Sequence, residues 1–206
     1  DLHTYFYLHQ GVVKAVEGVN LRIWPGTTLG VVGESGCGKS VTARSVLRIV
    51  EQPGRIVSGD IVFRRKMTGG QTEELNLGEY HDQSREMRSI RGKEISMIFQ
   101  EPMASLSPHY TIGSQIGENL LLHQDISKAE ARNRTIELLR DVGIARPETR
   151  VDAYPYQLSG GMCQRAVIAM AIACRPSLLI ADEPTTALDV TTEAQILDLL
   201  REMQEQ

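Results

Sequence analysis

The alternation of apolar and polar residues predicts an α/β chain. Leu2 to Tyr7 and Val12 to Ile23 carry β-branched and aromatic residues in partial alternation, which predicts two antiparallel strands joined around Gly11. Short apolar runs predict further strands at 28–32, 59–63, 94–99 and 177–181. After a first hydroxyl residue, the runs at 28–32 and 177–181 contain no polar side chain, as expected for strands that are buried on both faces of a parallel sheet.

Apolar residues at helical spacing predict helices between and after these strands. We expect them at 40–50, 113–123, 128–142, 160–174 and 190–205. Ser127 and Glu130 form a capping box that begins the third helix, and Gly143 ends it. Because the segment from about 101 to 174 is mostly helical and lies between two strand patterns, we expect it to be a helical subdomain inserted into an α/β core.

Residues 64–93 form a polar segment that is rich in Gly, Glu and Arg. We interpret it as a solvated insertion that ends in a short helix near Ser84 to Ile90. The alternative, that its basic residues face a membrane surface, stays open at this point.

Composition narrows the class of protein. With 206 residues, 41% of them hydrophobic and 23% charged, the chain suits one large globular domain or a core with a subdomain. A net charge of −4 gives no support to a nucleic-acid binder that relies on a basic field, and no apolar stretch is long enough to span a bilayer. The 3 cysteines lack C-x-x-C spacing, which is typical of a reducing cytoplasm without disulfides or a zinc site. Because Asp1 is not an initiator methionine, the true start is expected to precede it.

The chemistry centres on residues 33–40, Gly-Glu-Ser-Gly-Cys-Gly-Lys-Ser, which fit the phosphate-binding pattern G-x-x-x-x-G-K-[ST]. Its glycines allow successive backbone N–H groups to turn toward phosphate oxygens, and the following helix adds its positive end. Lys39 is predicted to bind the outer phosphates and the Ser40 hydroxyl to ligate Mg²⁺. The alternative is a glycine-rich turn with an unrelated lysine.

Three more segments add candidate site residues. Asp182 and Glu183 follow a buried strand, so Asp182 is expected to hold Mg²⁺ and Glu183 to polarise a water for attack on the γ-phosphate. Gln100 ends the strand at 94–99 and is expected at the edge of a site. Residues 158–165, Leu-Ser-Gly-Gly-Met-Cys-Gln-Arg, open an apolar helix capped by Ser159, which predicts a second anion-binding helix start.

Taken together, these motifs resemble the ATP-binding cassette (ABC) ATPase family, in particular its oligopeptide/dipeptide importer branch. The motifs are GESGCGKS as Walker A, Gln100 in ISMIFQEPM as the Q-loop, LSGGMCQR as the signature, LLIADEP as Walker B and TTALD as the D-loop with Asp189. Their order and spacing match over essentially the whole chain. The segments GVVKAV, RGKEISMIFQEPM and IADEPTTALDV are similar to sequences of the peptide branch. Related nickel importers are nearly as similar.

The resemblance implies a P-loop NTPase (RecA-like) core with an antiparallel β subdomain and an inserted α-helical subdomain. Residues 1–206 would form one ABC ATPase domain, in which 1–100 and 175–206 make the β subdomain and core and about 101–174 the helical subdomain. Family members carry a switch histidine beyond the D-loop helix, and none of the 5 histidines here can replace it. The chain is therefore expected to be truncated at its C-terminus, and hydrolysis by this chain alone stays open.

The resemblance also implies a composite site in which two such subunits sandwich two ATP molecules. The implied nucleotide-binding residues are Phe6, Gly33, Ser35, Gly36, Cys37, Gly38, Lys39, Ser40 and Val41. The implied metal site comprises Ser40, Gln100 and Asp182, and the implied catalytic residues are Glu183, Lys39 and Gln100. The residues implied to contact the other subunit's ATP are Ser159, Gly160, Gly161 and Gln164. Phe6 would stack on adenine; Tyr5 and Tyr7 are rivals, and packing within the β subdomain is the alternative role.

The implied function is an ATP-binding and ATP-hydrolysing subunit that powers a peptide importer. Its implied cofactors are ATP and Mg²⁺. Its implied partners are a second ABC ATPase subunit, identical or paralogous, membrane permease subunits and, indirectly, a substrate-binding protein, at the cytoplasmic face of the inner membrane. The alternatives are a nickel or other small-solute importer, a soluble ABC ATPase of DNA repair or translation, and a non-catalytic nucleotide-binding regulator. Cys163 departs from the branch, which usually has a basic or amide residue there, and could weaken a contact at the dimer interface.

Overall fold

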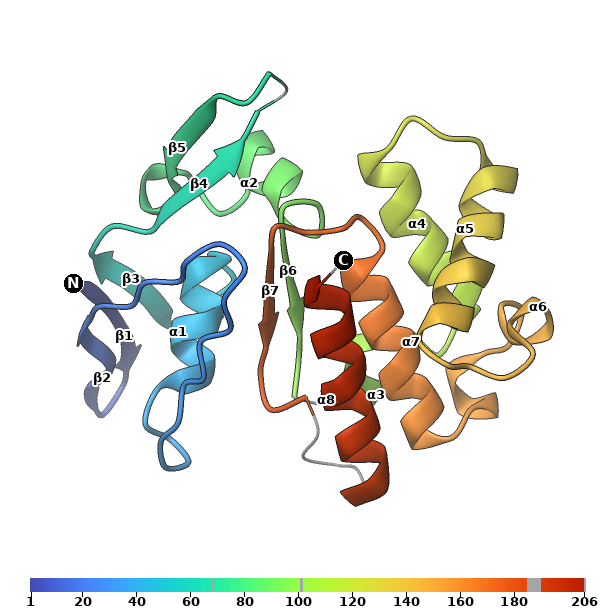
Figure 1. Cartoon of the computed structure of the whole chain (residues 1–206). Coiled ribbons are helices and arrows are strands. Elements are labelled where there is room, and N and C mark those ends of the chain that lie inside the picture. Colours follow the sequence, from blue (N-terminus) through green and yellow to red (C-terminus); the bar gives the residue numbers. More distant parts are fainter. Residues whose placement is uncertain (68, 101, 185–189, 206) are drawn as a thin grey trace. The chain divides into compact units, whose positions relative to one another are not determined.

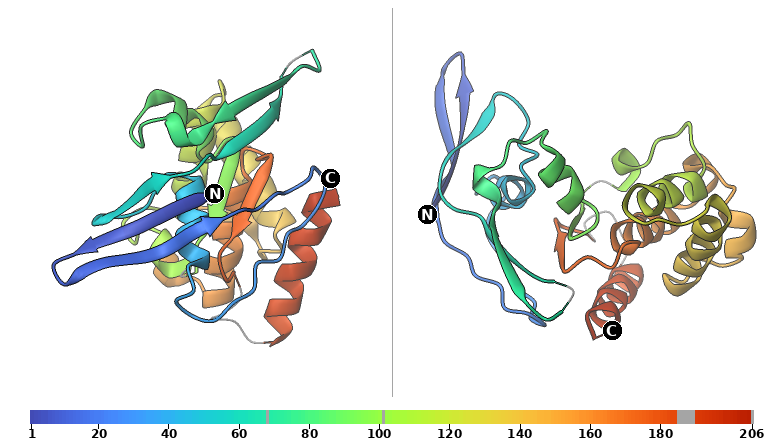
Figure 2. Two further views of the ribbon diagram at one scale, coloured as in Figure 1. Left: turned by 90° about the vertical axis from the view of Figure 1, so that its left-hand side faces the viewer. Right: turned by 90° about the horizontal axis from the view of Figure 1, so that it is seen from above.

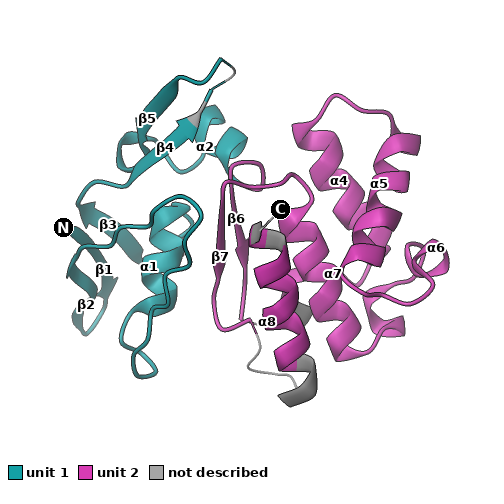
Figure 3. Cartoon of the chain, viewed as in Figure 1, with its two compact units in different colours: residues 1–91 teal, residues 92–206 magenta. Residues whose placement is uncertain are grey.

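The structure is a computed structural model of the chain, and it describes residues 1–67, 69–100, 102–184 and 190–205. The chain divides into two compact units, residues 1–91 and residues 92–206 (Figure 3). Each unit has its own sheet and helices.

Unit 1 begins with a three-stranded antiparallel sheet whose strand order is β2-β1-β3 (Figure 1). The strands are β1 (Leu2–Leu8), β2 (Gly11–Val19) and β3 (Gly54–Ser58). Leu8 pairs with Gly11 across the hairpin turn, which confirms the predicted antiparallel pair (Figure 2). The second strand ends at Val19 rather than at Ile23, directly after Gly18 turns the chain with a φ of 70°.

The predicted strand at 28–32 is wrong, because these residues form no strand in the structure. The whole run is exposed, and Val32 is 96% exposed. An apolar run becomes a strand only where a neighbour accepts its backbone hydrogen bonds, and no described strand of unit 1 pairs with it. Apolar composition alone therefore overstated the local order before the glycine-rich loop.

Helix α1 (Lys39–Val46) packs on this sheet through a buried polar contact. The Thr4 and Ser45 hydroxyls lie 2.9 Å apart, and both residues are fully buried. The helix ends at Val46 rather than at the predicted residue 50. The Arg91 guanidinium donates to the carbonyls of Leu47 and Arg48 at 2.8 and 3.0 Å and so stabilises the helix C-terminus.

The polar segment after β3 is more ordered than the sequence predicted. It contains the antiparallel strands β4 (Val62–Lys66) and β5 (Thr72–Asn76), the short 3₁₀ helix η1 (Leu77–Glu79) and α2 (Arg85–Ile90). Ion pairs of 2.6 and 2.7 Å, Arg64–Glu74 and Arg65–Glu73, connect β4 to β5. β4 overlaps the strand predicted at 59–63 but begins at Val62 and continues to Lys66. Because charged cross-strand pairs replace the apolar alternation after Phe63, the rest of the hairpin had no strand signal in the sequence. The predicted helix near residues 84–90 is confirmed, with Ser84 as its N-cap.

Unit 2 contains the parallel pair of strands β6 (Ile95–Ile98) and β7 (Leu178–Ala181). Ile95 pairs with Leu178 and Ile98 with Ala181, so the two strands end at the same edge. All four residues of β6 are buried, and both predicted strands are confirmed.

The helices of unit 2 share one apolar core with these strands. They are α3 (Pro102–Ser105), α4 (Ile112–His123), α5 (Lys128–Asp141), α6 (Pro147–Arg150), α7 (Gly160–Ile172) and α8 (Val190–Glu205), with the 3₁₀ helix η2 (Pro155–Gln157) before α7. Fully buried side chains of this core include Ile98, Ile112, Ile116, Leu120, Leu139, Ile168 and Ile196. Ser127 caps α5 by accepting from the Glu130 N–H, as predicted. None of the helices in the described ranges is long and apolar enough to cross a membrane.

Candidate functional site

The glycine-rich loop of residues 33–40 leads directly into α1 in unit 1. Gly36 and Gly38 have φ values of 82° and 98°, a region that residues with a Cβ rarely adopt. A Cβ on Gly38 would lie 2.2 Å from the Ala15 carbonyl oxygen on β2. The loop therefore needs glycine at Gly38 both for its backbone conformation and for its close approach to the sheet.

Lys39 lies at the start of α1, and its ammonium folds back over the loop. Its Nζ donates to the carbonyl oxygens of Gly33 and Glu34 at 2.8 and 2.9 Å. Phosphate oxygens are stronger acceptors for an ammonium than neutral carbonyls. A phosphate at this loop would therefore find a cation, exposed backbone and the positive end of a helix together.

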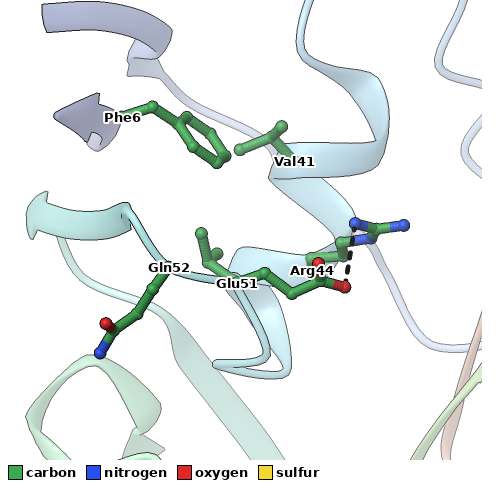
Figure 4. Close-up of a pocket in the computed structure, with 6 residues that line it drawn as sticks. Phe6, Val41, Arg44, Glu51 and Gln52 are labelled. Carbon is green, nitrogen blue, oxygen red and sulfur yellow. Dashed lines mark ion pairs between the residues drawn. The ribbon is translucent and has the colours of Figure 1, made fainter. Parts of the chain in front are cut away.

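A pocket of about 120 Å³ lies beside the same helix in unit 1 (Figure 4). It is lined by Phe6 of β1, by Val41 and Arg44 of α1, and by Val50, Glu51 and Gln52 before β3. The Phe6 ring points toward Val41, and the Arg44–Glu51 ion pair of 3.8 Å lies across the polar side of the pocket (Figure 4). An aromatic ring with apolar and hydrogen-bonding neighbours suits a flat heteroaromatic group such as a purine.

The two rival aromatic residues are engaged elsewhere on the sheet. The Tyr5 hydroxyl lies 3.2 Å from Nδ1 of His3, and Tyr7 is 46% exposed with the Arg55 guanidinium over its ring. Phe6 is thus the one of the three that lines the pocket. Arg44, Glu51 and Gln52 were missed by the sequence analysis, because no local pattern shows that they meet a residue on β1.

In unit 2, the ends of β6 and β7 bring together Gln100 and Glu183, which are 83 residues apart in the chain. Gln100 Nε2 donates to Glu183 Oε2 at 2.7 Å. Asp182 is 7% exposed, and its N–H donates to the Ile98 carbonyl at 2.9 Å, which continues the ladder beyond β7. Glu183 has a φ of 47°, a left-handed conformation that no local sequence pattern predicted.

The second predicted anion site lies at the start of α7. Ser159 accepts from the Met162 N–H at 3.3 Å, which confirms it as the N-cap. Gly160 is exposed, and a Cβ there would meet nothing within 4 Å. This helix start therefore leaves its first backbone N–H groups, including that of Gly161, near an open surface.

Gln164 and Cys163 point the other way, into the core. Gln164 is 1% exposed, and its amide Nε2 donates to the Pro184 carbonyl oxygen. Cys163 is fully buried, its Sγ lies 3.5 Å from the Pro155 carbonyl, and burial raises the pKa of its thiol. The Cys163 side chain does not reach the surface of unit 2, and the expectation that this residue could weaken an interface contact stays a prediction.

Each unit by itself offers hard oxygen donors for a metal: unit 1 has the Ser40 hydroxyl, and unit 2 has the Asp182 carboxylate and the Gln100 amide oxygen. In the described part of the chain, no three His, Cys, Asp or Glu side chains gather to hold a metal on their own. Hard oxygen donors suit Mg²⁺, which in nucleotide sites is bound by one or two protein oxygens together with phosphates. Asp189, predicted in the D-loop, lies outside the described residues.

The mixed α/β architecture and the loop before α1 define the class: a P-loop nucleotide-binding cassette. The family model described as "ABC transporter" matches residues 16–186, and the chain belongs to this family. This confirms the family and the fold class inferred from the motifs.

Curated relatives match along the full length of the chain. The "Probable peptide ABC transporter ATP-binding protein y4tR" of Sinorhizobium fredii is 51% identical over 206 residues, which is 100% of this chain and 58% of the relative. The "Oligopeptide transport ATP-binding protein OppD" of Bacillus subtilis is 49% identical over 205 residues, 99% of this chain and 54% of the relative. The chain thus spans somewhat more than half the length of these relatives.

Solved structures support the fold independently. A dimeric post-hydrolysis state of the ATP-binding cassette MJ0796 bound to ADP and Pi superposes with a TM-score of 0.83 at 27% identity, and the match covers 99% of this chain and 81% of the other. A further dimeric structure of the same cassette has a TM-score of 0.81 at 26% identity, with the same coverage of both chains.

Proposed function

We propose that this chain is the ATP-binding and ATP-hydrolysing part of a subunit that powers a peptide ABC importer. The observation that carries the proposal is the match along the whole chain to relatives named for peptide, oligopeptide and dipeptide transport. In this proposal residues 1–206 are one ABC ATPase domain, with the helical subdomain at about 101–174 and the β subdomain and core at 1–100 and 175–206.

Unit 1 would bind the nucleotide. Bound Mg²⁺–ATP supplies the phosphoryl group that is transferred to water. The backbone N–H groups of residues 33–41 would hold the phosphates, Lys39 would leave its two carbonyl partners to neutralise the outer phosphates, and the Ser40 hydroxyl would ligate Mg²⁺. Phe6 would stack on the base in the pocket beside Val41.

Unit 2 would supply the residues that activate water. The Glu183 carboxylate would orient a water and accept its proton, which is general-base catalysis. Gln100, already 2.7 Å from that carboxylate, would help position the water or the Mg²⁺, and Asp182 would hold the ion through its waters. Catalysis then consists of positioning and electrostatic stabilisation.

The exposed start of α7 supports a composite site. Ser159, Gly160 and Gly161 would contact the ATP of a second ABC ATPase subunit, identical or paralogous. The similar cassette MJ0796 is described as a dimer. Permease subunits would retain the pair at the cytoplasmic face of the cell membrane, with a substrate-binding protein acting indirectly. For Gln164, whose side chain is buried and bonded to the Pro184 carbonyl, this proposal includes no contact with a partner's ATP.

A transport assay tests the proposed function as a whole. In cells that carry the intact gene or a version with Lys39→Ala, uptake of a radiolabelled tripeptide and of nickel ions is compared. We expect peptide uptake to be lost and nickel uptake to be unchanged in the variant. Loss of nickel uptake alone would replace peptides by nickel as the cargo, and unchanged uptake of both would contradict a transport role.

Replacing Phe6 by alanine should weaken ATP binding without abolishing it. Base–aromatic stacking contributes roughly 1–3 kcal/mol, so we expect the Kd to rise about tenfold to a hundredfold. Titration with a fluorescent ATP analogue measures this change. Tyr7→Ala is the matched control, because it removes a neighbouring ring that does not line the pocket. A larger effect in Tyr7→Ala or Tyr5→Ala would transfer the stacking role to that residue.

Cys37 offers a chemical test of the loop. This thiol is exposed, whereas Cys163 is buried and Cys174 half-buried, and burial raises the pKa of both. N-ethylmaleimide should therefore modify Cys37 first. Mg²⁺–ATP at ten times its Kd should slow that modification about tenfold, since only the free protein reacts. Peptide mass spectrometry gives the rates; equal rates with and without ATP would argue against nucleotide on this loop.

A further inference from the structure

A buried amide connects the helix that follows the glycines at 160–161 to the residues after β7. Gln164 projects from the second turn of α7, is 1% exposed and donates its Nε2 to the Pro184 carbonyl. A buried amide is costly unless it is bonded, so this contact fixes where residue 184 can lie. Both residues belong to unit 2.

The residue that this contact adjoins has an unusual backbone. Glu183 has a φ of 47°, which side chains with a Cβ disfavour. It also precedes a proline, a position that normally favours extended backbone. Such a conformation persists only where the surroundings determine it, and it is common at functional sites.

Three hydrogen bonds hold three consecutive residues at this point. The Asp182 N–H donates to the Ile98 carbonyl, Gln100 donates to the Glu183 carboxylate, and Gln164 donates to the Pro184 carbonyl. The hydrogen bond from Asp182 fixes the backbone before Glu183, and the hydrogen bond from Gln164 fixes the backbone after Glu183. Without the hydrogen bond from Gln164, the chain after Glu183 is free to relax toward the extended conformation that Pro184 favours.

We propose that Gln164 is a positioning residue for Glu183. It clamps the Pro184 carbonyl, keeps Glu183 left-handed and so directs the Glu183 carboxylate toward Gln100. This rests on the proposed function, in which Glu183 activates the attacking water. It also joins α7, whose exposed start is proposed to meet a partner's ATP, to the proposed catalytic carboxylate of the same chain.

The test compares Gln164→Met with a matched control, Thr135→Val. Methionine keeps the length of the side chain but cannot donate to Pro184. Thr135 is also fully buried in unit 2, and its hydroxyl donates to the Ala131 carbonyl within α5 at 2.8 Å. Each variant thus removes one buried hydrogen bond from the same unit, and only Gln164→Met removes it beside Glu183.

The first readout is hydrogen exchange, which needs no turnover. In Gln164→Met we expect the amides of Asp182 and Glu183 to exchange about tenfold faster, as for one lost hydrogen bond, while amides in α4 and α5 keep their wild-type rates. Thr135→Val should leave residues 182–183 unchanged. Unchanged exchange at these residues in Gln164→Met overturns the proposal, and so does faster exchange spread evenly over unit 2.

The second readout is the turnover of Mg²⁺–ATP. Gln164→Met should lower kcat about tenfold or more and leave the Kd for ATP within twofold, whereas Thr135→Val should change neither. Wild-type kcat in Gln164→Met would overturn the catalytic part of the proposal. Glu183→Gln is measured beside it. If that variant retains turnover, the proposed catalytic role of Glu183 is wrong, and the hydrogen-exchange result still tests whether Gln164 holds the backbone at Glu183.

Discussion

Lys39→Ala is expected to lose ATP binding almost completely. The Lys39 ammonium folds back onto the loop of residues 33–40. Its Nζ lies 2.8 and 2.9 Å from the Gly33 and Glu34 carbonyl oxygens. Charge-assisted bonds to phosphate contribute about 1.5–3 kcal/mol each, so loss of two should raise the Kd about a hundredfold or more. Alanine also leaves those two carbonyls without their cation.

Calorimetric titration with Mg²⁺–ATP measures this effect directly. Lys14→Ala is the matched control, since it removes an exposed lysine of the same unit that pairs with Glu17 at 2.6 Å. The control should bind ATP with a Kd within twofold of the wild type. An unchanged Kd in Lys39→Ala would mean that the loop does not bind phosphate, and the assignment of the whole nucleotide site would fail with it.

Local signals in the sequence were sufficient to predict the helices and strands that carry the candidate site residues. Ser127 and Ser159 are N-caps as the sequence predicted, because a cap is decided by residues within one turn of the helix. The strands at β6 and β7 were equally clear, since each is a compact apolar run with polar residues directly after it.

Features that depend on distant partners were not predictable in the same way. Residues 28–32 have the composition of a buried strand, but no described strand of unit 1 pairs with them. The hairpin of β4 and β5 pairs residues about ten apart in the chain, such as Arg64 with Glu74, whose side chains also form an ion pair. Composition reports what a segment can form, whereas pairing across the chain decides what it does form.

The same limit applies to the candidate site. The motifs placed Gln100 and Glu183 at strand ends, but only the register of β6 against β7 explains why their side chains meet at 2.7 Å. The left-handed backbone of Glu183 and the burial of Gln164 have no signature in a single sequence. These are the features on which the positioning proposal depends.

Glu183→Gln should abolish turnover while leaving ATP binding intact. Glutamine has nearly the same shape, and its amide oxygen can still accept the hydrogen bond from Gln100 that the carboxylate accepts at 2.7 Å. It cannot take a proton from water, and loss of a general base typically lowers the rate about 10²- to 10⁴-fold. Phosphate release and ATP titration, measured together, separate the two effects.

The matched control is Glu137→Gln, which makes the same change at an exposed position of α5. It should release phosphate at the wild-type rate, whereas near-normal release by Glu183→Gln would remove that residue from the catalytic role.

The dependence of the wild-type rate on protein concentration adds a second result. If each site is completed by Ser159, Gly160 and Gly161 of another subunit, the rate should rise faster than linearly with concentration. A linear rise that still disappears in Glu183→Gln would keep the carboxylate as the base and reject the composite site, because each chain would then hydrolyse ATP alone.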